Sequence, residues 1–297
     1  TARPGVRPWY GLLRNNTLVT MHQPVPVVIC DSGDGGLSVL RAVREFMPEQ
    51  DILYLADQAH VPYGPRPLLQ VREFAEGITR FLLDRGARLI VVACNAASAA
   101  SLHYLRNTFP DVPFVGMEPA VKPAAEQTRS GVVGVLATPA TFQGALYASV
   151  LERFARDVTV LQDTCPGLVA EVESGNLEGD AVREILTNAL SPMLQAGIDT
   201  VVLGCTHYPF VIPLIQEIAG PGVRVIDPAP AIARQTRRLL SQNGWGLNGT
   251  GSIQCFTTGP VESMKLLVKQ LLGDDLPVEH ATWEGGVLSG NSRQSSH

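Results

Sequence analysis

Two cysteines end similar apolar stretches of the chain and are the first candidates for chemistry. The stretch IVVACNAAS at 90–98 contains Cys94, and TVVLGCTHY at 200–208 contains Cys205. A cysteine between a strand and a helix lies at the helix N-terminus, where free backbone N–H groups and the helix dipole favour the thiolate. The matching positions predict two reactive thiols, although a single buried cysteine is more often an apolar core residue.

The other three cysteines give no such signal. Cys30 falls inside a predicted strand, Cys255 falls in the late strand SIQCFTT, and Cys165 in DTCPGLV is open to either interpretation. The five cysteines are odd in number and widely spaced, and none belongs to a CxxC pair. This pattern favours neither a disulfide framework nor a zinc site, so no metal is expected.

Polar side chains accompany both candidate thiols and raise the odds that the thiols are reactive. Asn95 follows the first cysteine, and Thr206 and His207 follow the second. Asp31 and Ser32 end a third apolar run, VVICDSGDGG, which belongs to the same predicted sheet as the first cysteine. This polar company favours reactive rather than structural cysteines, although a lone histidine is more often structural.

The glycine-rich turn after this run has two interpretations. Asp31 could cap a helix that begins near Leu37, with Gly33, Gly35 and Gly36 allowing a tight turn. The turn could instead hold a ligand, but it is neither G-x-G-x-x-G nor G-x-x-x-x-G-K-S/T, so it predicts no dinucleotide or triphosphate. Backbone N–H groups at such a turn fit a small anion such as a carboxylate better.

The elements that position these residues follow from the periodicity of the chain. Buried strands are predicted at short runs rich in Val, Ile and Leu, namely 25–30, 51–56, 88–94, 112–117, 131–137, 158–161, 200–205 and 223–227. Helix-length segments lie between most of them, for example 68–86 and 180–197. This alternation predicts an α/β fold with parallel sheets, in which ligands bind beyond the carboxyl ends of the strands.

The order strand, polar turn, helix, and later strand, cysteine, helix occurs twice, which predicts an internal duplication. We therefore expect two similar parallel-sheet α/β lobes related by pseudo-two-fold symmetry, with the active site in the cleft between them. The first lobe is expected to comprise 24–118 plus 226–282 and the second 119–225, flanked by a loose N-terminal extension at 1–23 and a flexible tail at 283–297. The two cysteines face each other if the lobes do.

Composition argues against several classes of partner. The 297 residues are 45% hydrophobic with a formal net charge of -5, and no cluster of Lys and Arg suggests nucleic acid or an anionic membrane surface. No uninterrupted run of about 18 apolar residues could span a bilayer, and residues 1–23 lack the apolar block of a signal peptide. We expect a cytoplasmic protein with no nucleic-acid or membrane partner.

Five motifs in order make the chain similar to a known family. CDSGDGGLSVLRAVREFMPEQDILYLAD, VPYG, VVACNAAS, GVLATPAT and LGCTHYPF resemble the glutamate racemases of the aspartate/glutamate racemase superfamily across residues 25–240. The resemblance implies an isomerase with two α/β lobes around a buried cleft and with neither a metal nor pyridoxal phosphate as cofactor. It also implies interconversion of L- and D-glutamate for peptidoglycan, the cell wall and cell shape, and it allows a homodimer.

The chemistry of this family agrees with the residues. Inverting a stereocentre needs one group to remove the α-proton and another to deliver a proton to the opposite face, as Cys94 and Cys205 on facing lobes could do. One of them must begin as a thiolate, which an ordinary thiol pKa of about 8.5 allows. By resemblance, Asp31 assists the first cysteine, while His207 and Glu173 assist the second. For Glu173, in GLVAEVESG, an exposed helix carboxylate is the ordinary interpretation.

The resemblance also implies which residues bind the substrate. Hydroxyls, amides and main-chain N–H groups hold glutamate at positions that correspond here to Asp31, Ser32, Pro62, Tyr63, Gly64, Asn95, Ala96, Thr138, Thr141 and Thr206. Without the family, Tyr63 could be a packing aromatic, and Thr138 and Thr141 could be helix caps.

Four residues depart from the family pattern. Ala96 replaces the usual Thr or Ser and removes a hydroxyl worth about 1.5 to 3 kcal/mol against a charged group, which leaves aspartate or another acidic amino acid open as substrate. Asp34 replaces an apolar residue, and Gln58 and His60 replace smaller polar ones near the expected entrance. Two other classes stay open, a hydrolase with one cysteine nucleophile and a two-lobed binding protein whose cysteines are spectators.

Overall fold

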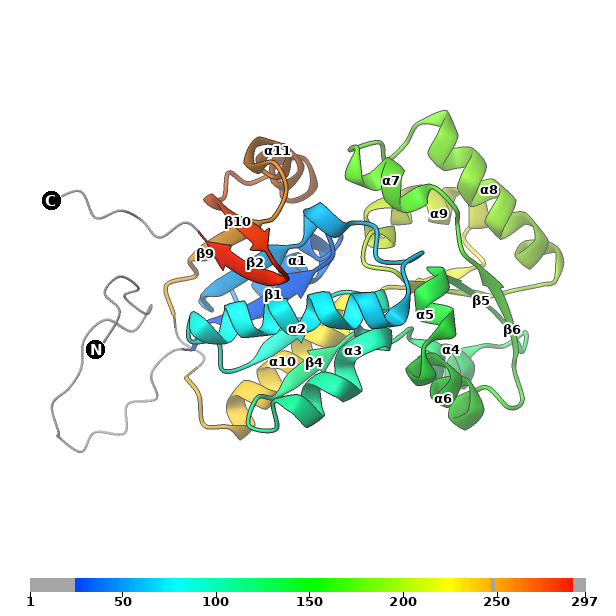
Figure 1. The fold of residues 1–297 in the computed structure, drawn as a ribbon. Helices are drawn as coiled ribbons and strands as arrows, with labels where there is room; N and C mark the ends of the chain where they lie inside the picture. Colours follow the sequence, from blue (N-terminus) through cyan, green and yellow to red (C-terminus); the bar gives the residue numbers. More distant parts are fainter. Residues whose placement is uncertain (1–24, 247–248, 291–297) are drawn as a thin grey trace, which may run out of the picture.

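The computed structural model describes residues 25–246 and 249–290, which form two lobes, each built on one sheet (Figure 1). Elements from both ends of this part of the chain, mostly blue, cyan, orange and red, make the first lobe, and green elements make most of the second. The expected N-terminal extension at 1–23 and the end of the expected tail, 291–297, lie outside the described residues.

The larger sheet carries the first lobe and is parallel except at one edge. Its strand order is β11-β10-β9-β2-β1-β3-β4, and β11 runs antiparallel to β10. The strands are β1 (Val27–Asp31), β2 (Ile52–Ala56), β3 (Ile90–Val92), β4 (Phe114–Gly116), β9 (Ile253–Thr257), β10 (Val278–Glu284) and β11 (Val287–Gly290). The helices are α1 (Leu37–Phe46), the 3₁₀-helix η1 (Gln58–His60), α2 (Leu68–Asp84), α3 (Asn95–Thr108), α10 (Ala229–Gln242) and α11 (Val261–Leu272).

The smaller sheet carries the second lobe, and its strands are all parallel. Its order is β6-β5-β7-β8. The strands are β5 (Val132–Ala137), β6 (Thr159–Asp163), β7 (Thr200–Gly204) and β8 (Arg224–Ile226). The helices are α4 (Val121–Gln127), α5 (Pro139–Gln143), α6 (Ala145–Phe154), α7 (Leu168–Glu173), α8 (Asp180–Gln195), the 3₁₀-helix η2 (Tyr208–Val211) and α9 (Ile212–Ala219).

The two sheets share one strand order, which is what a duplicated lobe requires. β1 lies between β2 and β3, with β4 beyond, and β5 lies between β6 and β7, with β8 beyond. The prediction of an α/β fold with two parallel sheets is confirmed. β3 and β7, which precede the two candidate cysteines, therefore occupy equivalent places in the two lobes.

The expected flexible tail at 283–297 is wrong for residues 283–290. β10 continues into this segment, and β11 pairs with it across a turn at Gly285 and Gly286, whose φ values are 56° and 81°. Two residues with positive φ form the tight turn that suits the twist of a hairpin, and glycine adopts them without strain. Leu288 is buried against the first lobe. Two glycines between alternating apolar residues are the sequence signal for this hairpin.

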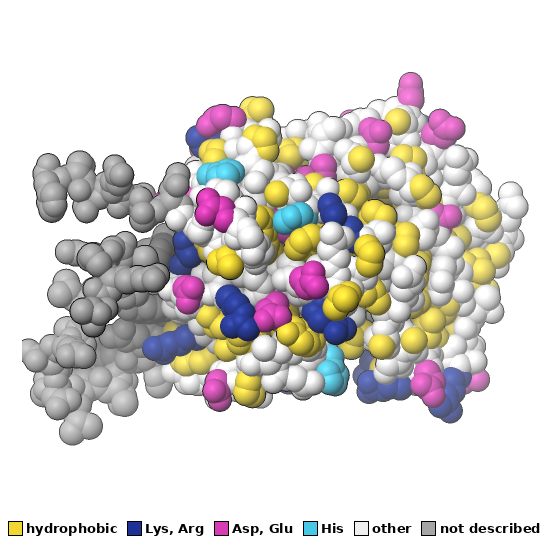
Figure 2. Space-filling model, viewed as in Figure 1, with side chains coloured by type: hydrophobic (Ala, Val, Ile, Leu, Met, Phe, Trp, Pro, Cys, Tyr) yellow, Lys and Arg dark blue, Asp and Glu magenta, His cyan; other side chains and the backbone are white. Residues whose placement is uncertain are grey.

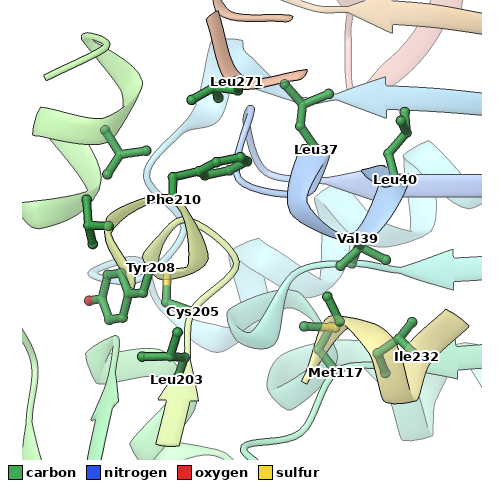
Figure 3. Close-up of a cluster of buried hydrophobic side chains, with 14 of the residues drawn as sticks. Leu37, Val39, Leu40, Met117, Leu203, Cys205, Tyr208, Phe210, Ile232 and Leu271 are labelled. Carbon is green, nitrogen blue, oxygen red and sulfur yellow. The ribbon is translucent and has the colours of Figure 1, made fainter. Parts of the chain in front are cut away.

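One hydrophobic cluster continues from the first lobe into the second. In Figure 3, Leu37 and Leu40 of α1 and Met117 after β4 belong to the same buried cluster as Leu203 of β7 and Phe210 of η2. Burial of these apolar side chains therefore stabilises the contact between the lobes as well as each lobe within itself. The lobes are joined close to the strand ends that carry the cysteines.

The surface carries charges of both signs. On the face in Figure 2, Lys and Arg side chains are interspersed with Asp and Glu. Within the described ranges, no helix is both long and apolar enough to cross a membrane.

Asp199, just before β7, holds the turn that leads into β5. Its carboxylate accepts hydrogen bonds from Thr128 Oγ1 (2.7 Å), Arg129 N (2.5 Å) and Ser130 N (2.9 Å). Partial burial raises the pKa of this carboxyl, but the hydrogen bonds outweigh it and bring the pKa to about 2. The ionised side chain therefore stabilises the second lobe.

We expect Asp199→Asn to lower the free energy of unfolding at pH 7 by about 1 kcal/mol, allowing for solvent screening at this partly exposed site. Because the pKa is depressed in the folded state, the contribution of Asp199 is complete above about pH 4 and is lost as the pH falls toward 2. Urea unfolding between pH 2 and 7 measures the difference, with the exposed Asp157→Asn as control. A difference that is absent, or that does not shrink in acid, contradicts this account.

Candidate active site

The carboxyl ends of equivalent strands from the two sheets enclose one small cavity. It is lined by Ser32, Pro62, Tyr63, Gly64, Cys94, Asn95, Ala96, Thr138, Val169, Cys205, Thr206 and His207. Of the predicted site residues, Asp31, Thr141 and Glu173 do not line the cavity, but each contacts a residue that does. Both candidate cysteines therefore face the same space.

Cys94 follows β3 and lies at the N-terminus of α3, as expected. Its Sγ accepts a hydrogen bond from Ala97 N at 3.4 Å and lies 3.6 Å from Ser32 Oγ. Burial and the nearby charge of Asp31 raise the pKa of Cys94 well above its usual value, against the opposing effects of Ala97 and Ser32. This environment favours the protonated thiol.

Cys205 follows β7, but the predicted helix N-terminus at this thiol is wrong. The chain first makes the short 3₁₀-helix η2, and α9 begins only at Ile212. A helix beginning at Thr206 would place Pro213 in its interior, where the ring lacks a donor and clashes with the carbonyl four residues earlier. The polar partner of Cys205 is instead His207, with 3.6 Å between Sγ and Nδ1.

His207 forms a buried ion pair with Glu173 of α7, with 2.5 Å between Nε2 and Oε1. Burial lowers the pKa of His207, but its hydrogen bonds with Cys205 and Glu173 outweigh this and raise the pKa well above its usual value. Burial raises the pKa of Glu173, yet the bond and charge of His207 lower it overall. His207 is therefore favoured as the imidazolium, which lies beside the sulfur of Cys205.

The glycine turn after β1 receives this ion pair from the second lobe. A Cβ added at Gly33 would lie 2.2 Å from Glu173 Oε1, and one at Gly35 would lie 2.5 Å from His207 Nδ1. These glycines have negative φ, so the expected tight turn is not what requires them. They are needed because the two lobes approach to backbone distance here.

Asp31 lies at the end of β1 with its side chain almost fully buried. One carboxylate oxygen accepts hydrogen bonds from Gly36 N, at the start of α1, and from Thr206 Oγ1 of the second lobe at 3.3 Å. The N-cap residue of α1 is Gly36 and not Asp31 as expected, although the Asp31 carboxylate bonds to the Gly36 N–H and also contacts the site. Burial raises its pKa to about 6, against the charge of His207 and the backbone hydrogen bonds. A carboxyl with this pKa can exchange protons near neutral pH.

Asn95 carries the clearest sign of an open polar position in the cavity. Its Oδ1 and Nδ2 atoms are both buried, and neither has a hydrogen-bond partner. A buried amide with its donor and acceptor unpaired is costly, so a ligand that bonds to both would stabilise the site. Thr138 also lines the cavity, and Thr141 lies behind it, with 3.1 Å between their hydroxyls.

Of the four residues that depart from the family pattern, one lines the cavity and three do not. Ala96 lines the cavity. Gln58 and His60 do not line it; Gln58 Nε2 donates to Asp34, and His60 stacks on Phe74. Asp34 is buried behind the ion pair, and its backbone N–H donates to Glu173 Oε1 at 2.9 Å.

One lining residue was not predicted. Val169 belongs to α7 and lies four residues before Glu173, so the two share a helix face. The helical spacing from the predicted carboxylate is the signal that identifies it.

The remaining cysteines belong to the core. Burial raises the pKa of Cys30 and Cys165 well above the usual range and that of Cys255 to about 12. None of the three lines the cavity. In the part of the chain that the structure describes, no group of three or more His, Cys, Asp or Glu side chains is arranged to hold a metal ion.

Known proteins share this sequence pattern. The family model for Asp/Glu/Hydantoin racemases matches residues 37–236. The chain is 48% identical to the glutamate racemase of Roseiflexus sp. (strain RS-1) over 257 residues, which cover 86% of this chain and 93% of that protein. It is also 48% identical to a glutamate racemase of Pseudomonas aeruginosa (strain PAO1) over 248 residues, 83% of this chain and 94% of that protein.

Solved structures share the fold. Glutamate racemase isoform RacE1 from Bacillus anthracis has a TM-score of 0.79 and 31% identity, covering 90% of this chain and all of that one. The glutamate racemase of Escherichia coli, solved with L-glutamate and the activator UDP-MurNAc-ala, has a TM-score of 0.77 and 31% identity over 90% of this chain. The fold and the cavity thus define a two-lobed α/β racemase architecture.

The chain belongs to the Asp/Glu/Hydantoin racemase family, as the five sequence motifs predicted. The curated relatives named above are all glutamate racemases.

We expect Glu173→Gln to lower the pKa of His207, because the variant removes the carboxylate whose hydrogen bond and charge favour the imidazolium. NMR titration of the His207 ring measures this directly. Glu171→Gln is the matched control, since Glu171 lies on the same helix but bonds to Asn176. A His207 titration that is the same in both variants contradicts the proposed role of the ion pair.

Proposed function

We propose that the protein is a glutamate racemase that interconverts L- and D-glutamate by proton transfer at the α-carbon, with no cofactor. One observation carries the proposal: Cys94 and Cys205 come from equivalent strands of two duplicated lobes and line the same cavity. The names of the relatives support the choice of glutamate, because those that cover most of this chain are glutamate racemases.

The two cysteines have the unequal surroundings that a two-base reaction needs. In one direction the thiolate of Cys205 takes the α-proton, and the thiol of Cys94 delivers its proton to the opposite face of the carbanion. The reaction leaves Cys205 as a thiol and Cys94 as a thiolate, so the reverse direction begins from that state. His207 stabilises the thiolate form of Cys205, and Asp31, with a pKa of about 6, assists proton exchange at Cys94.

The substrate is held by neutral groups and backbone dipoles. The amide of Asn95 and the hydroxyls of Ser32, Thr138 and Thr206 line the cavity and suit the carboxylates and the ammonium group of glutamate. The backbone N–H groups at the start of α3 lie beside Cys94. They stabilise the negative charge that develops on the α-carboxylate as the proton leaves.

The biological role follows from the activity. D-glutamate formed by the protein would supply peptidoglycan, and thereby the cell wall and cell shape. The E. coli glutamate racemase is solved with UDP-MurNAc-ala as activator, which ties that protein to a cell-wall precursor. The cytoplasmic location and the homodimer stay predictions.

A cysteine hydrolase explains the site less well. It would need one nucleophilic thiol with a base, for which Cys205 and His207 would suffice. The second thiol at the equivalent strand end, and Asp31 beside it, would then have no catalytic role.

We expect the protein to convert L-glutamate in deuterated water into D-glutamate labelled at Cα, and we expect Cys94→Ser and Cys205→Ser each to reduce racemisation by roughly 10³-fold or more. Each variant lacks one of the two groups that handle the proton. NMR and chiral chromatography measure label and product, with Cys255→Ala, outside the cavity, as control. A hydrolase is indicated if one cysteine is dispensable and no exchange occurs at Cα.

Ala96 gives a second test of the substrate. We expect Ala96→Ser to lower the KM for D-glutamate about three- to tenfold, because the new hydroxyl adds a hydrogen bond in the cavity. Steady-state kinetics with glutamate and aspartate measure the effect, with Ala99→Ser on the same helix as control. An unchanged KM for glutamate shows that position 96 does not contact the substrate, and faster turnover of aspartate than glutamate by the unmodified protein overturns the choice of substrate.

A further inference from the structure

A buried carboxylate outside the cavity connects the substrate loop to the C-terminal hairpin. Asp57 follows β2 and is fully buried. Its Oδ1 accepts hydrogen bonds from Thr258 Oγ1 (2.8 Å) and Trp283 Nε1 (2.7 Å). Its Oδ2 accepts from Tyr63 OH (2.6 Å) and from His60 Nδ1 (2.9 Å). Four donors, two of them from the segment directly after Asp57 and two from the C-terminal part of the lobe, therefore replace water around one carboxylate.

Trp283 is held in place from two sides. It belongs to β10, and its ring packs so closely on α2 that a Cβ at Gly77 would lie 2.6 Å from two of its carbons. It also meets the edge of His60, with ring centroids 5.4 Å apart, and His60 stacks on Phe74 at 3.9 Å. This packing fixes the orientation of the ring, so that its indole N–H points at Asp57.

The loop at 61–64 connects this carboxylate to the cavity, because Tyr63 both bonds to Asp57 and lines the cavity. Pro62, Tyr63 and Gly64 line the cavity from the first lobe. The carbonyl of Gly64 accepts a hydrogen bond from Ala140 N of the second lobe at 3.0 Å. A Cβ at Gly64 would lie 2.7 Å from Thr138 Cβ, so the loop closes tightly on that lobe. Its position decides whether the cavity is complete.

We propose that Trp283 is a positioning residue for the substrate: by bonding to Asp57 it fixes Tyr63 and the 61–64 loop against the second lobe. The C-terminal hairpin then sets the affinity for glutamate without touching it. This inference rests on the proposed function for its substrate, but the geometry of the loop can be tested without it.

The first test separates binding from chemistry. Trp283→Phe keeps an aromatic ring and removes the N–H donor, so we expect the KM for glutamate to rise about tenfold while kcat changes less than about twofold. Tyr63→Phe removes the hydrogen bond from the Tyr63 hydroxyl to Asp57. The double variant should raise the KM by much less than the product of the single effects, because both act through Asp57. Trp245→Phe, at a tryptophan that packs on a different hydrophobic cluster from Trp283, is the matched control.

The second test does not depend on activity. We expect amide hydrogen exchange in residues 58–66 to become about tenfold faster in Trp283→Phe and to stay unchanged in Trp245→Phe. Gly77→Ala keeps the tryptophan in the sequence but displaces its indole, so it should produce the same faster exchange. It replaces Trp283→Phe as the test if that variant folds poorly.

The outcomes separate the two claims. Unchanged exchange in both Trp283→Phe and Gly77→Ala overturns the positioning role, whatever the activity of the protein. A fall in kcat with no change in KM also overturns it. A protein that does not racemise glutamate at all contradicts the proposed function, while the exchange measurement still decides whether Trp283 fixes the loop.

Discussion

The close approach of the His207–Glu173 pair to the glycine turn of the first lobe is the contact on which the site depends. Any side chain at Gly33 or Gly35 would overlap that pair. Because the two lobes meet here at backbone distance, the pair is buried and Thr206 reaches Asp31 of the opposite lobe. The same approach brings the strand end with Cys205 opposite the one with Cys94 and closes the shared core beneath them.

Equivalent strands carry the two cysteines into unequal surroundings. Cys94 is buried near a carboxyl, which favours the thiol, whereas Cys205 lies beside a histidine that its ion pair with Glu173 keeps protonated. A duplicated fold would by itself give two similar groups. In the proposed mechanism, the different residues that follow each strand make one cysteine the acid and the other the base, as inversion at a single carbon requires.

Periodicity predicted the strands, the parallel sheets and the equivalence of the two lobes, because these depend on local apolar patterns. The motifs predicted nearly all of the residues around the cavity. What was missed depends on contacts between distant segments. Gly35 is needed because His207, which is far along the chain, packs against it. Its φ is not positive, so the local backbone gives no reason for a glycine there. Other misses had local signals, namely Pro213 against a helix at Cys205 and the paired glycines of the C-terminal hairpin.

The central claim is that two thiols approach one carbon from opposite sides. A crystal structure with bound L- or D-glutamate tests it most directly. The account predicts that the α-carbon lies between the sulfur atoms of Cys94 and Cys205, on a nearly straight line and within about 3 to 4 Å of each. Both sulfur atoms on one face of the substrate, or one of them out of reach of the α-carbon, would contradict it.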